Sequence, residues 1–524
     1  MGDKNGGVIR GRAAPSPTGR VHIGNMRTFL FNSLFIRHNN GINVLRVEDT
    51  DQKRSVEKGL EGIIEVLEQY GITFQEGPHV GGEYGPYVQT ERKDSYKEVA
   101  EKLVNDGNAY YCFCSSERLA ALREDQVKNK VKPGYDRHCR DIASDEARKR
   151  VEAGESHVIR LKFPTEGEFR YDDIVFGELK FKNKDMEDIV ILKSDGLPTY
   201  NFGVVVDDHA MAITHAMRAR EYLSEIPKNI FIYRSLGWEP ARYIHVPEVL
   251  NPDGKGKLSK RKGALPAISY LRKGYLVEAM INFLALLGWS PSPENAHEDE
   301  IYSEDELVKF FDESRINRAP ARFDQRKLDY MNGKHIRAMS IDQLADRVVR
   351  WAEDLVLKEF ITDMYEEKME WEVALKASVE SALPKWKADM EYFKKALTLV
   401  HERLVYLSEI PELLNFIYAD ELEMSDEVWN FKNHDKAETA AALKGVLPKL
   451  DEVFANGVND HEAWEESVRG YADEIGWKHG DLFMAIRSAT TGAVKSPPLF
   501  ESFQVMGWEK GRGFMEAAVK YLES

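Results

Sequence analysis

The chain has 524 residues, and 43% of them are hydrophobic and 31% charged, which is ordinary for a globular protein but too long for one hydrophobic core. No apolar run approaches the ~20 residues that span a bilayer, and the polar residues 1–7 have no apolar core for a signal peptide, so a cytoplasmic protein of three or four domains is expected. The formal net charge of −16 gives no support to a nucleic-acid partner, but it does not exclude one, because net charge does not report local potential.

Strand and helix patterns alternate at the start of the chain. Residues 8–14 predict a strand that a proline-rich loop ends, and apolar residues recur at helical spacing from His22 onward. Residues 42–47 predict a second strand, and Ser55 is expected to cap a helix that ends at Gly71. This order is typical of a parallel α/β sheet, in which ligands bind at the carboxyl ends of the strands.

The sequence pattern changes near residue 110. Residues 110–191 hold a charged helical stretch and short strand-like pieces at 157–163 and 189–192, so we expect an insertion into the α/β domain. The α/β pattern is expected to resume at 199–208.

The last third of the chain is predicted to be helical. From residue 341 prolines are sparse and strand alternation is absent. One apolar face is traced by Ile341, Leu344, Ala345, Val348, Trp351 and Leu355.

The first motif that carries chemistry lies where the proline-rich loop enters the first helix. Ser16 and Thr18 can donate hydrogen bonds to phosphate oxygens, and His22 and Asn25 lie at a helix start, which favours anions. Gly24 leaves room for a flat base to approach the backbone. Taken alone, such a stretch is most often only a helix start.

The second motif lies more than two hundred residues later. It holds Lys257, Ser259 and Lys260, and glycines stand nearby at positions 254, 256 and 263. A loop of this kind can close over a triphosphate and neutralise the charge of a pentavalent transition state. Taken alone, a lysine-rich stretch is usually a solvated loop.

All three cysteines of the chain, Cys112, Cys114 and Cys139, fall in one short segment. An odd number in a cytoplasmic chain is not a disulfide framework, and the clustering indicates a metal site. Structural zinc usually takes four ligands, and the fourth ligand here is either Tyr135 or His138. Ordinary zinc chemistry favours histidine. Three reduced cysteines without metal are the alternative.

The two motifs, in this order and flanking the cysteine cluster, resemble the ATP-handling motifs of class I aminoacyl-tRNA synthetases, and their surroundings resemble the bacterial-type glutamyl-tRNA synthetase family. The resemblance implies a Rossmann-type catalytic domain with a zinc-bearing insertion, followed by an all-α anticodon-binding region. It divides the chain into a first catalytic half at 1–109, an acceptor-end insertion at 110–198, a second catalytic half with a stem-contact region at 199–330, and a helical anticodon-binding region at 331–524.

The same resemblance implies roles for single residues. The expected catalytic residues are His22, Asn25, Lys257 and Lys260. The expected ATP site comprises Ser16, Thr18, His22, Gly24, Asn25, Lys257, Ser259 and Lys260. The expected glutamate site comprises Arg12, Ser16, Glu48, Tyr200, Asn201 and Arg218, with Glu48 holding the α-amino group. Two arginines suit a side-chain carboxylate, and glutamine there would leave buried charge poorly paired, at a cost of about 3–5 kcal/mol.

Further expectations also follow from the resemblance. Relatives with this spacing favour Tyr135 as the fourth ligand of one structural zinc ion, and Mg²⁺ is expected with ATP. Arg403 falls where an anticodon-reading arginine occurs, although a surface arginine is an equal alternative. The expected partners are tRNA(Glu), ATP and L-glutamate, without a membrane, and monomer is the family default.

The predicted reaction is the ATP-dependent attachment of L-glutamate to tRNA(Glu) through a glutamyl-adenylate, with bound tRNA needed for activation. A non-discriminating enzyme that also glutamylates tRNA(Gln) is the alternative within the family. A small-molecule adenylyltransferase and a non-catalytic RNA-binding protein are the rivals outside it. The helical third and the cysteine insertion count against the former, and His22, Lys257 and Lys260 against the latter.

Overall fold

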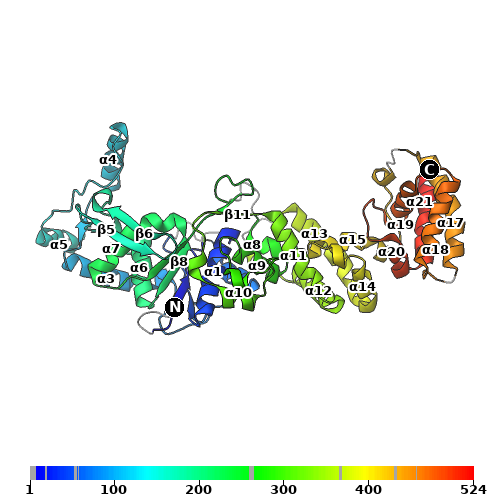
Figure 1. Ribbon diagram of the computed structural model, residues 1–524. Coiled ribbons are helices and arrows are strands. Elements are labelled where there is room, and N and C mark those ends of the chain that lie inside the picture. Colours follow the sequence, from blue (N-terminus) through cyan, green and yellow to red (C-terminus); the bar gives the residue numbers. More distant parts are fainter. Residues whose placement is uncertain are drawn as a thin grey trace. The chain divides into compact units, whose positions relative to one another are not determined.

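A computed structural model describes residues 7–17, 21–51, 56, 58–258, 265–364, 369–429, 433–455 and 457–524. The chain divides into two compact units. Figure 1 labels the helices and strands along the chain. The first unit comprises residues 1–269, 277–328 and 360–366, and the second comprises 270–276, 329–359 and 367–524. No helix within the described ranges is long and apolar enough to cross a membrane.

A four-stranded parallel sheet forms the centre of the first unit. Its strands lie in the order β2-β1-β8-β9, and their bounds are Ile42–Leu45, Arg10–Ala13, His215–Ala219 and Arg242–Val246. Since β2 follows β1 on one side and β8 lies on its other side, the strand order reverses between β1 and β8. In open parallel sheets the carboxyl edge at such a reversal is the usual place for a ligand.

Helix α1 (Ile23–His38) packs on β1, β2 and β8. Its predicted apolar face is confirmed, since Met26, Leu30 and Leu34 are buried. Helix α2 (Gly59–Gln69) ends before Gly71, whose φ of 68° suits a residue without a side chain. The predicted cap Ser55 lies outside the described residues, and the residue that precedes α2 is Lys58.

The insertion carries its own strands. A three-stranded antiparallel sheet has the order β3-β4-β7, with bounds Ala109–Cys112, Val158–Leu161 and Val190–Leu192. A hairpin is formed by β5 (Glu168–Asp173) and β6 (Gly177–Lys182). This hairpin packs on β9, where the rings of Tyr171 and Tyr243 lie 5.7 Å apart. The insertion therefore joins the central sheet at its β9 edge.

Other elements of the first unit surround these sheets. Helix α6 follows the insertion over the segment where the α/β pattern was predicted to resume, and it leads into β8. The remaining bounds are α3 (Lys93–Asn105), α4 (Ser116–Lys128), α5 (Ser144–Glu152), α6 (Tyr200–Ala210), α7 (Ile226–Leu236), β10 (Val249–Leu250), α8 (Ala267–Arg272), α9 (Val277–Ala285), α10 (Glu304–Phe310), β11 (Ala321–Arg322) and α11 (Gln325–Arg337).

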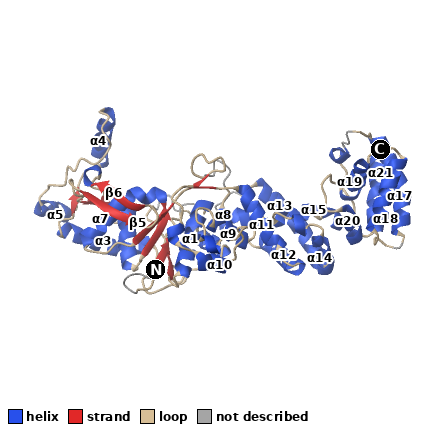
Figure 2. Cartoon of the chain, viewed as in Figure 1, coloured by secondary structure: helices blue, strands red, loops and turns tan. Residues whose placement is uncertain are grey.

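The second unit is helical, as predicted, and Figure 2 shows no strand in the described part of residues 331–524. A capping box between Ser340 and Gln343 begins α12, and its predicted face buries Leu344, Ala345 and Val348. The helices are α12 (Ile341–Leu357), α13 (Glu370–Ala388), α14 (Met390–Thr398), α15 (Ile410–Leu413), α16 (Asn415–Tyr418), α17 (Lys436–Phe454), α18 (His461–Glu474), α19 (His479–Thr491), α20 (Leu499–Met506) and α21 (Trp508–Glu523).

Candidate active site

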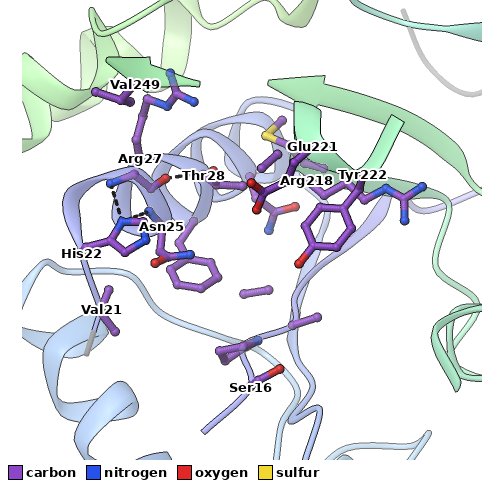
Figure 3. Close-up of a pocket in the computed structure, with 18 of the residues that line it drawn as sticks. Ser16, Val21, His22, Asn25, Arg27, Thr28, Arg218, Glu221, Tyr222 and Val249 are labelled. Carbon is purple, nitrogen blue, oxygen red and sulfur yellow. Dashed lines mark hydrogen bonds between the residues drawn. The ribbon is translucent and has the colours of Figure 1, made fainter. Parts of the chain in front are cut away.

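A cavity of about 650 Å³ opens at the carboxyl edge of the central sheet, where the strand order reverses. Most of its wall comes from the loop after β1, the first turns of α1, and the ends of β8 and β9 with the residues that follow, and Glu48, Ile63 and Tyr200 complete it. Figure 3 shows Ser16, His22, Asn25 and Tyr222 around this space. Parallel α/β sheets bind ligands at this position.

His22 caps the first turn of α1. Its Nδ1 accepts hydrogen bonds from the backbone N–H groups of Gly24 at 3.1 Å and Asn25 at 3.3 Å. A nitrogen that accepts carries no proton, so the proton of the neutral ring lies on Nε2, which can donate. A Cβ on residue 24 would lie 3.1 Å from the His22 ring, so the glycine avoids a close contact with the capping side chain. The helix start therefore combines a donor with the positive end of the helix dipole.

Arg27 lines the cavity and was not predicted. It is 2% exposed, and it donates hydrogen bonds to the carbonyl oxygens of Leu287 at 3.1 Å and Pro247. Burial lowers its pKa to about 10. The signal in the sequence is a charged residue within an apolar helix face. Arg27 ties α1 to the end of β9, which positions the cavity wall.

Arg12, on β1, is held by groups beneath the cavity. Its Nε donates to Asp208 Oδ1 at 3.0 Å, and an Nη donates to the carbonyl oxygen of Met217 at 3.2 Å. The same Asp208 oxygen accepts a hydrogen bond of 2.6 Å from Arg46. All of these charged groups are buried. The first motif indicated Arg12 but not its partners, because Asp208 on α6 and Met217 on β8 lie far away in the chain.

Glu48 also lines the cavity, and it accepts a hydrogen bond of 3.2 Å from Arg46. Burial raises the pKa of Glu48, and the nearby Arg46 and Arg12 oppose that rise. The carboxylate follows β2, so it reaches the same edge of the sheet as Arg12. A carboxylate at this point suits an ammonium group.

Arg218 differs from Arg12 because its terminal nitrogens have no partner. It is 5% exposed on β8, and both Nη atoms are buried without a hydrogen bond. The face of Tyr243 lies 4.3 Å from its guanidinium carbon. A buried unpaired charge is costly, so an anion in the adjoining cavity would be bound strongly.

Tyr200 and Asn201 begin α6, but they face different spaces. Tyr200 lines the cavity and its ring lies 5.3 Å from that of Tyr222, a lining residue that was not predicted. Burial raises the pKa of Tyr200, which is therefore protonated. Asn201 does not line this cavity. It donates a hydrogen bond of 2.6 Å to Glu225 and lines a second space of about 590 Å³ beside the insertion.

The second motif reaches the mouth of the cavity through Lys257. Its Nζ lies 2.6 Å from Glu221 Oε2, and both side chains are half exposed. The structure thus brings together, as lining residues, Arg12, Ser16, His22, Gly24, Asn25, Glu48, Tyr200, Arg218 and Lys257. Thr18, Ser259 and Lys260 lie outside the described residues.

The three cysteines of the insertion do come together, with Sγ atoms within 4.8 Å of one another. The Tyr135 hydroxyl lies 3.3 Å from Cys112 Sγ and 3.6 Å from Cys114 Sγ, and Cys114 Sγ lies 3.6 Å from Cys139 Sγ. Arg160 donates to the sulfur of Cys112. Burial acts to raise the pKa of Cys112, but hydrogen bonds from Tyr135 and Arg160 outweigh burial and lower that pKa. Arg118 donates to the sulfur of Cys114, but burial raises the pKa of Cys114 to about 11. His138 is exposed and is not part of this group of described residues.

Arg403 lies in the second unit, on the surface. It donates a hydrogen bond of 2.6 Å to the carbonyl oxygen of Ser496, and Arg487 donates to the same oxygen at 3.2 Å. Burial, together with the charge of Arg403, lowers the pKa of Arg487. Arg487 was not predicted. Two guanidinium groups therefore meet at one carbonyl, which leaves excess positive charge there.

Known proteins match nearly the whole length of this chain. The catalytic domain of the class I tRNA synthetases (E and Q) matches residues 8–330, and an anticodon binding domain matches 337–513. The glutamate–tRNA ligase of Dehalococcoides mccartyi is 42% identical over 514 residues, 98% of each chain. That of Treponema denticola is 39% identical over 98% of this chain and 99% of its own.

A solved structure is similar as well. It is the crystal structure of a glutamate tRNA ligase from Elizabethkingia meningosepticum in complex with its amino acid, with a TM-score of 0.79 at 29% identity, covering 98% of this chain and 99% of that one. On the fold, the cavity and these relatives together, the chain belongs to the glutamate–tRNA ligase family of class I aminoacyl-tRNA synthetases.

Proposed function

We propose that this chain attaches L-glutamate to tRNA(Glu) in two steps, with ATP as the energy source. The α-carboxylate of glutamate attacks the α-phosphate of Mg²⁺-bound ATP, which forms glutamyl-adenylate and releases pyrophosphate. A terminal ribose hydroxyl of the tRNA then attacks the acyl carbon and releases AMP. The observation that supports this most strongly is Arg218, whose two buried Nη atoms lack acceptors beside the cavity that His22 lines.

In this proposal particular lining residues bind particular groups of glutamate or ATP. Arg218 pairs the side-chain carboxylate of glutamate, and Arg12 lies beside it on the neighbouring strand. Glu48 holds the α-ammonium group. Ser16 and the start of α1, with His22 and Asn25, hold the phosphates. The attacking carboxylate is already ionised at neutral pH, so catalysis is positioning and electrostatic stabilisation, to which Lys257 and Lys260 contribute positive charge.

We also propose that the cysteine cluster holds one structural zinc ion with Tyr135 as the fourth ligand. Tetrahedral zinc with Zn–S bonds of about 2.3 Å separates two sulfurs by about 3.8 Å, and a Zn–O bond of about 2.0 Å separates oxygen and sulfur by about 3.5 Å. The distances of 3.6 Å between Cys114 and Cys139 and of 3.3 and 3.6 Å to Tyr135 fit this geometry. When bound, zinc would cross-link the two ends of this segment.

For the RNA side, we propose that Arg403 contacts the anticodon and that Arg487 assists it. Their shared acceptor, the Ser496 carbonyl, leaves most of their donors available to a base edge or phosphate. Relatives of this chain are named for ligation to tRNA, and the matched anticodon binding domain includes both arginines.

Aminoacylation with purified tRNA(Glu), ATP and labelled glutamate tests the proposal. Arg218→Ala is expected to raise the KM for glutamate about 100-fold, since truncating one partner of a buried charge pair costs about 2–5 kcal/mol. Arg242→Ala is the matched control, because Arg242 is exposed at the other end of the neighbouring strand, and it should leave charging unchanged.

Two results would contradict the proposal. Charging that is equally strong with glutamine and glutamate would reject the carboxylate pocket. Pyrophosphate exchange that proceeds with glutamate while no ester forms on tRNA would favour the small-molecule adenylyltransferase instead.

A further inference from the structure

Three buried side chains form a hydrogen-bonded line behind the cavity. Arg218 Nε lies 3.0 Å from His245 Nε2, and His245 Nδ1 lies 2.6 Å from Asp173 Oδ2. Their exposures are 5%, 0% and 1%. Arg218 and His245 are register partners on β8 and β9, while Asp173 ends β5 of the insertion. The line therefore runs from the insertion to the cavity wall.

The proton positions in this line follow from the donors. An arginine Nε always carries a proton, so His245 Nε2 must accept, and the ring proton must lie on Nδ1 and be donated to Asp173. Burial lowers the pKa of His245 to about 4, so the ring is neutral near pH 7. Asp173 is fixed in turn, because its Oδ1 accepts from the backbone N–H groups of Val175 at 3.0 Å and Phe176 at 2.9 Å.

These contacts leave Arg218 little freedom. The Tyr243 ring, 4.3 Å from the guanidinium carbon, holds the plane of the group, and His245 holds its Nε edge. Only the two Nη atoms remain without partners. The guanidinium of Arg218 is already fixed through its Nε and its plane. It therefore loses little conformational entropy when its two Nη atoms bind a planar carboxylate.

We propose that His245 and Asp173 are positioning residues for the amino-acid carboxylate, acting through Arg218. Asp173 fixes the tautomer of His245, and His245 orients the Arg218 fork. Because Asp173 is carried by the β5–β6 hairpin, selection of the amino acid depends on the insertion as well as on the central sheet. This inference rests on the proposed function, in which Arg218 pairs the side-chain carboxylate of glutamate.

Asp173→Asn tests the proposal with almost no change of shape. If the amide oxygen stays on the backbone N–H groups, the amide NH₂ faces His245 and forces the ring proton onto Nε2, against Arg218. If the amide turns over, its NH₂ faces the backbone N–H groups. Either way two donors meet in a buried place, so the KM for glutamate should rise about 10-fold to 100-fold, with the KM for ATP nearly unchanged.

Two variants of His245 separate positioning from packing. His245→Gln keeps an acceptor within reach of Arg218 Nε and should retain glutamate binding better than His245→Leu, which has none. In the His245→Gln background, Asp173→Asn should raise the KM for glutamate less than it does in the parent, because no ring tautomer remains to be reversed. A merely structural role would instead lower kcat and thermal midpoint for all substrates alike, without this rescue.

Arg218→Ala distinguishes a failure of the positioning role from a failure of the proposed function. If Arg218→Ala raises the KM for glutamate but Asp173→Asn and His245→Leu leave it within twofold of the parent, the positioning role is wrong and the proposed function stands. If Arg218→Ala itself leaves that KM unchanged, the proposed function fails and this inference fails with it. Equal loss in His245→Gln and His245→Leu would also overturn the positioning role.

Discussion

At the scale of single residues, three arginines and three carboxylates balance one another beneath the cavity. Asp208 accepts from Arg12 and Arg46, and Asp207 accepts from Arg92 at 2.7 Å. The six residues are Arg12, Arg46, Arg92, Asp207, Asp208 and Glu48, all less than 9% exposed. Charges this deeply buried are tolerated only as a paired set. The proposed glutamate site is therefore part of a larger network that holds β1, β2 and α6 together.

Asp208→Asn should destabilise the first unit strongly. The substitution leaves Arg12 and Arg46 with one negative charge fewer, and breaking a buried pair costs about 3–5 kcal/mol. The measurement is hydrogen exchange of the amide protons in β1 and β2, which reports the free energy of opening for this unit. Arg37→Ala is the control, because the Arg37–Glu304 pair is 39% exposed on both sides and should contribute less than about 1 kcal/mol.

The same comparison has a definite pH dependence. Burial acts to raise the pKa of Asp208, but Arg12 and Arg46 outweigh burial and hold it below its usual value. A carboxyl whose pKa is lower in the folded state stabilises the fold above its unfolded pKa of about 3.9, and the stabilisation is lost as pH falls through the folded value. The difference between parent and Asp208→Asn should therefore be constant near pH 7 and shrink in strong acid. A difference that grows in acid would contradict this account.

At the scale of elements, helices with one apolar face were predictable and strand pairing was not. The spacing of apolar residues located α1 and α12 within a few residues, because that signal is local. The run Val204–Val206 in α6 is apolar throughout, so it fits a buried strand and a buried helix alike. The order β2-β1-β8-β9 joins segments two hundred residues apart, and no local pattern encodes such pairing.

Some residues of the candidate site could also be predicted from the sequence, and others could not. Arg12, His22, Glu48 and Arg218 could be located because they lie in or beside recognisable motifs. Arg27, His245 and Asp173 could not, because their roles depend on which distant groups meet them after folding. The motif also placed Asn201 in the glutamate site, whereas the first turn of α6 directs it to Glu225 and the second space. Residue type alone does not tell which side of a helix start faces a cavity.

The cysteine-containing segment gives a prediction that belongs to a whole element. If zinc joins β3 to residues 135–139, the purified protein should contain about one zinc ion per chain by mass spectrometry. Tyr135→Phe should lose zinc to a chelator faster than the parent, and Cys139→Ser should lose most of it. Removal of the ion should expose residues 113–139 to protease, because the segment then lacks its cross-link.

His138→Ala is the matched control for the zinc ligands. His138 is adjacent to Cys139 but exposed, so this variant should keep the parent's zinc content. The opposite pattern, with zinc lost from His138→Ala and kept in Tyr135→Phe, would assign the histidine as the ligand. Protein that folds with its usual protease resistance and binds no zinc would reject the metal site.

At the scale of the whole molecule, the two units divide the predicted recognition of substrates. The first holds the cavity and the cysteine cluster, and the second holds the arginine pair at Ser496. Glutamate and ATP would thus be bound by residues of the first unit, and the anticodon by residues of the second. Substitutions in one unit should then affect its own substrate selectively, a separation that steady-state kinetics can measure.

The arginine pair offers the sharpest test of that separation. Arg403→Ala and Arg487→Ala should each raise the KM for tRNA(Glu) about 5-fold to 150-fold, which corresponds to the 1–3 kcal/mol of a base-edge contact, while the KM values for glutamate and ATP stay unchanged. Arg469→Ala is the control, because Arg469 is a surface arginine of the same unit that pairs with Glu465 one helical turn away.

Charging of tRNA(Gln) by the same variants decides between the two modes of tRNA recognition. If the parent charges only tRNA(Glu), Arg403→Ala should lower the ratio of kcat/KM between the two tRNAs, since a lost base contact removes discrimination. If the parent charges both equally, Arg403 contributes affinity alone and both KM values should rise together. Loss of charging on tRNA(Glu) through kcat, with its KM unchanged, would contradict an anticodon role, because a contact made only to the anticodon should first weaken binding.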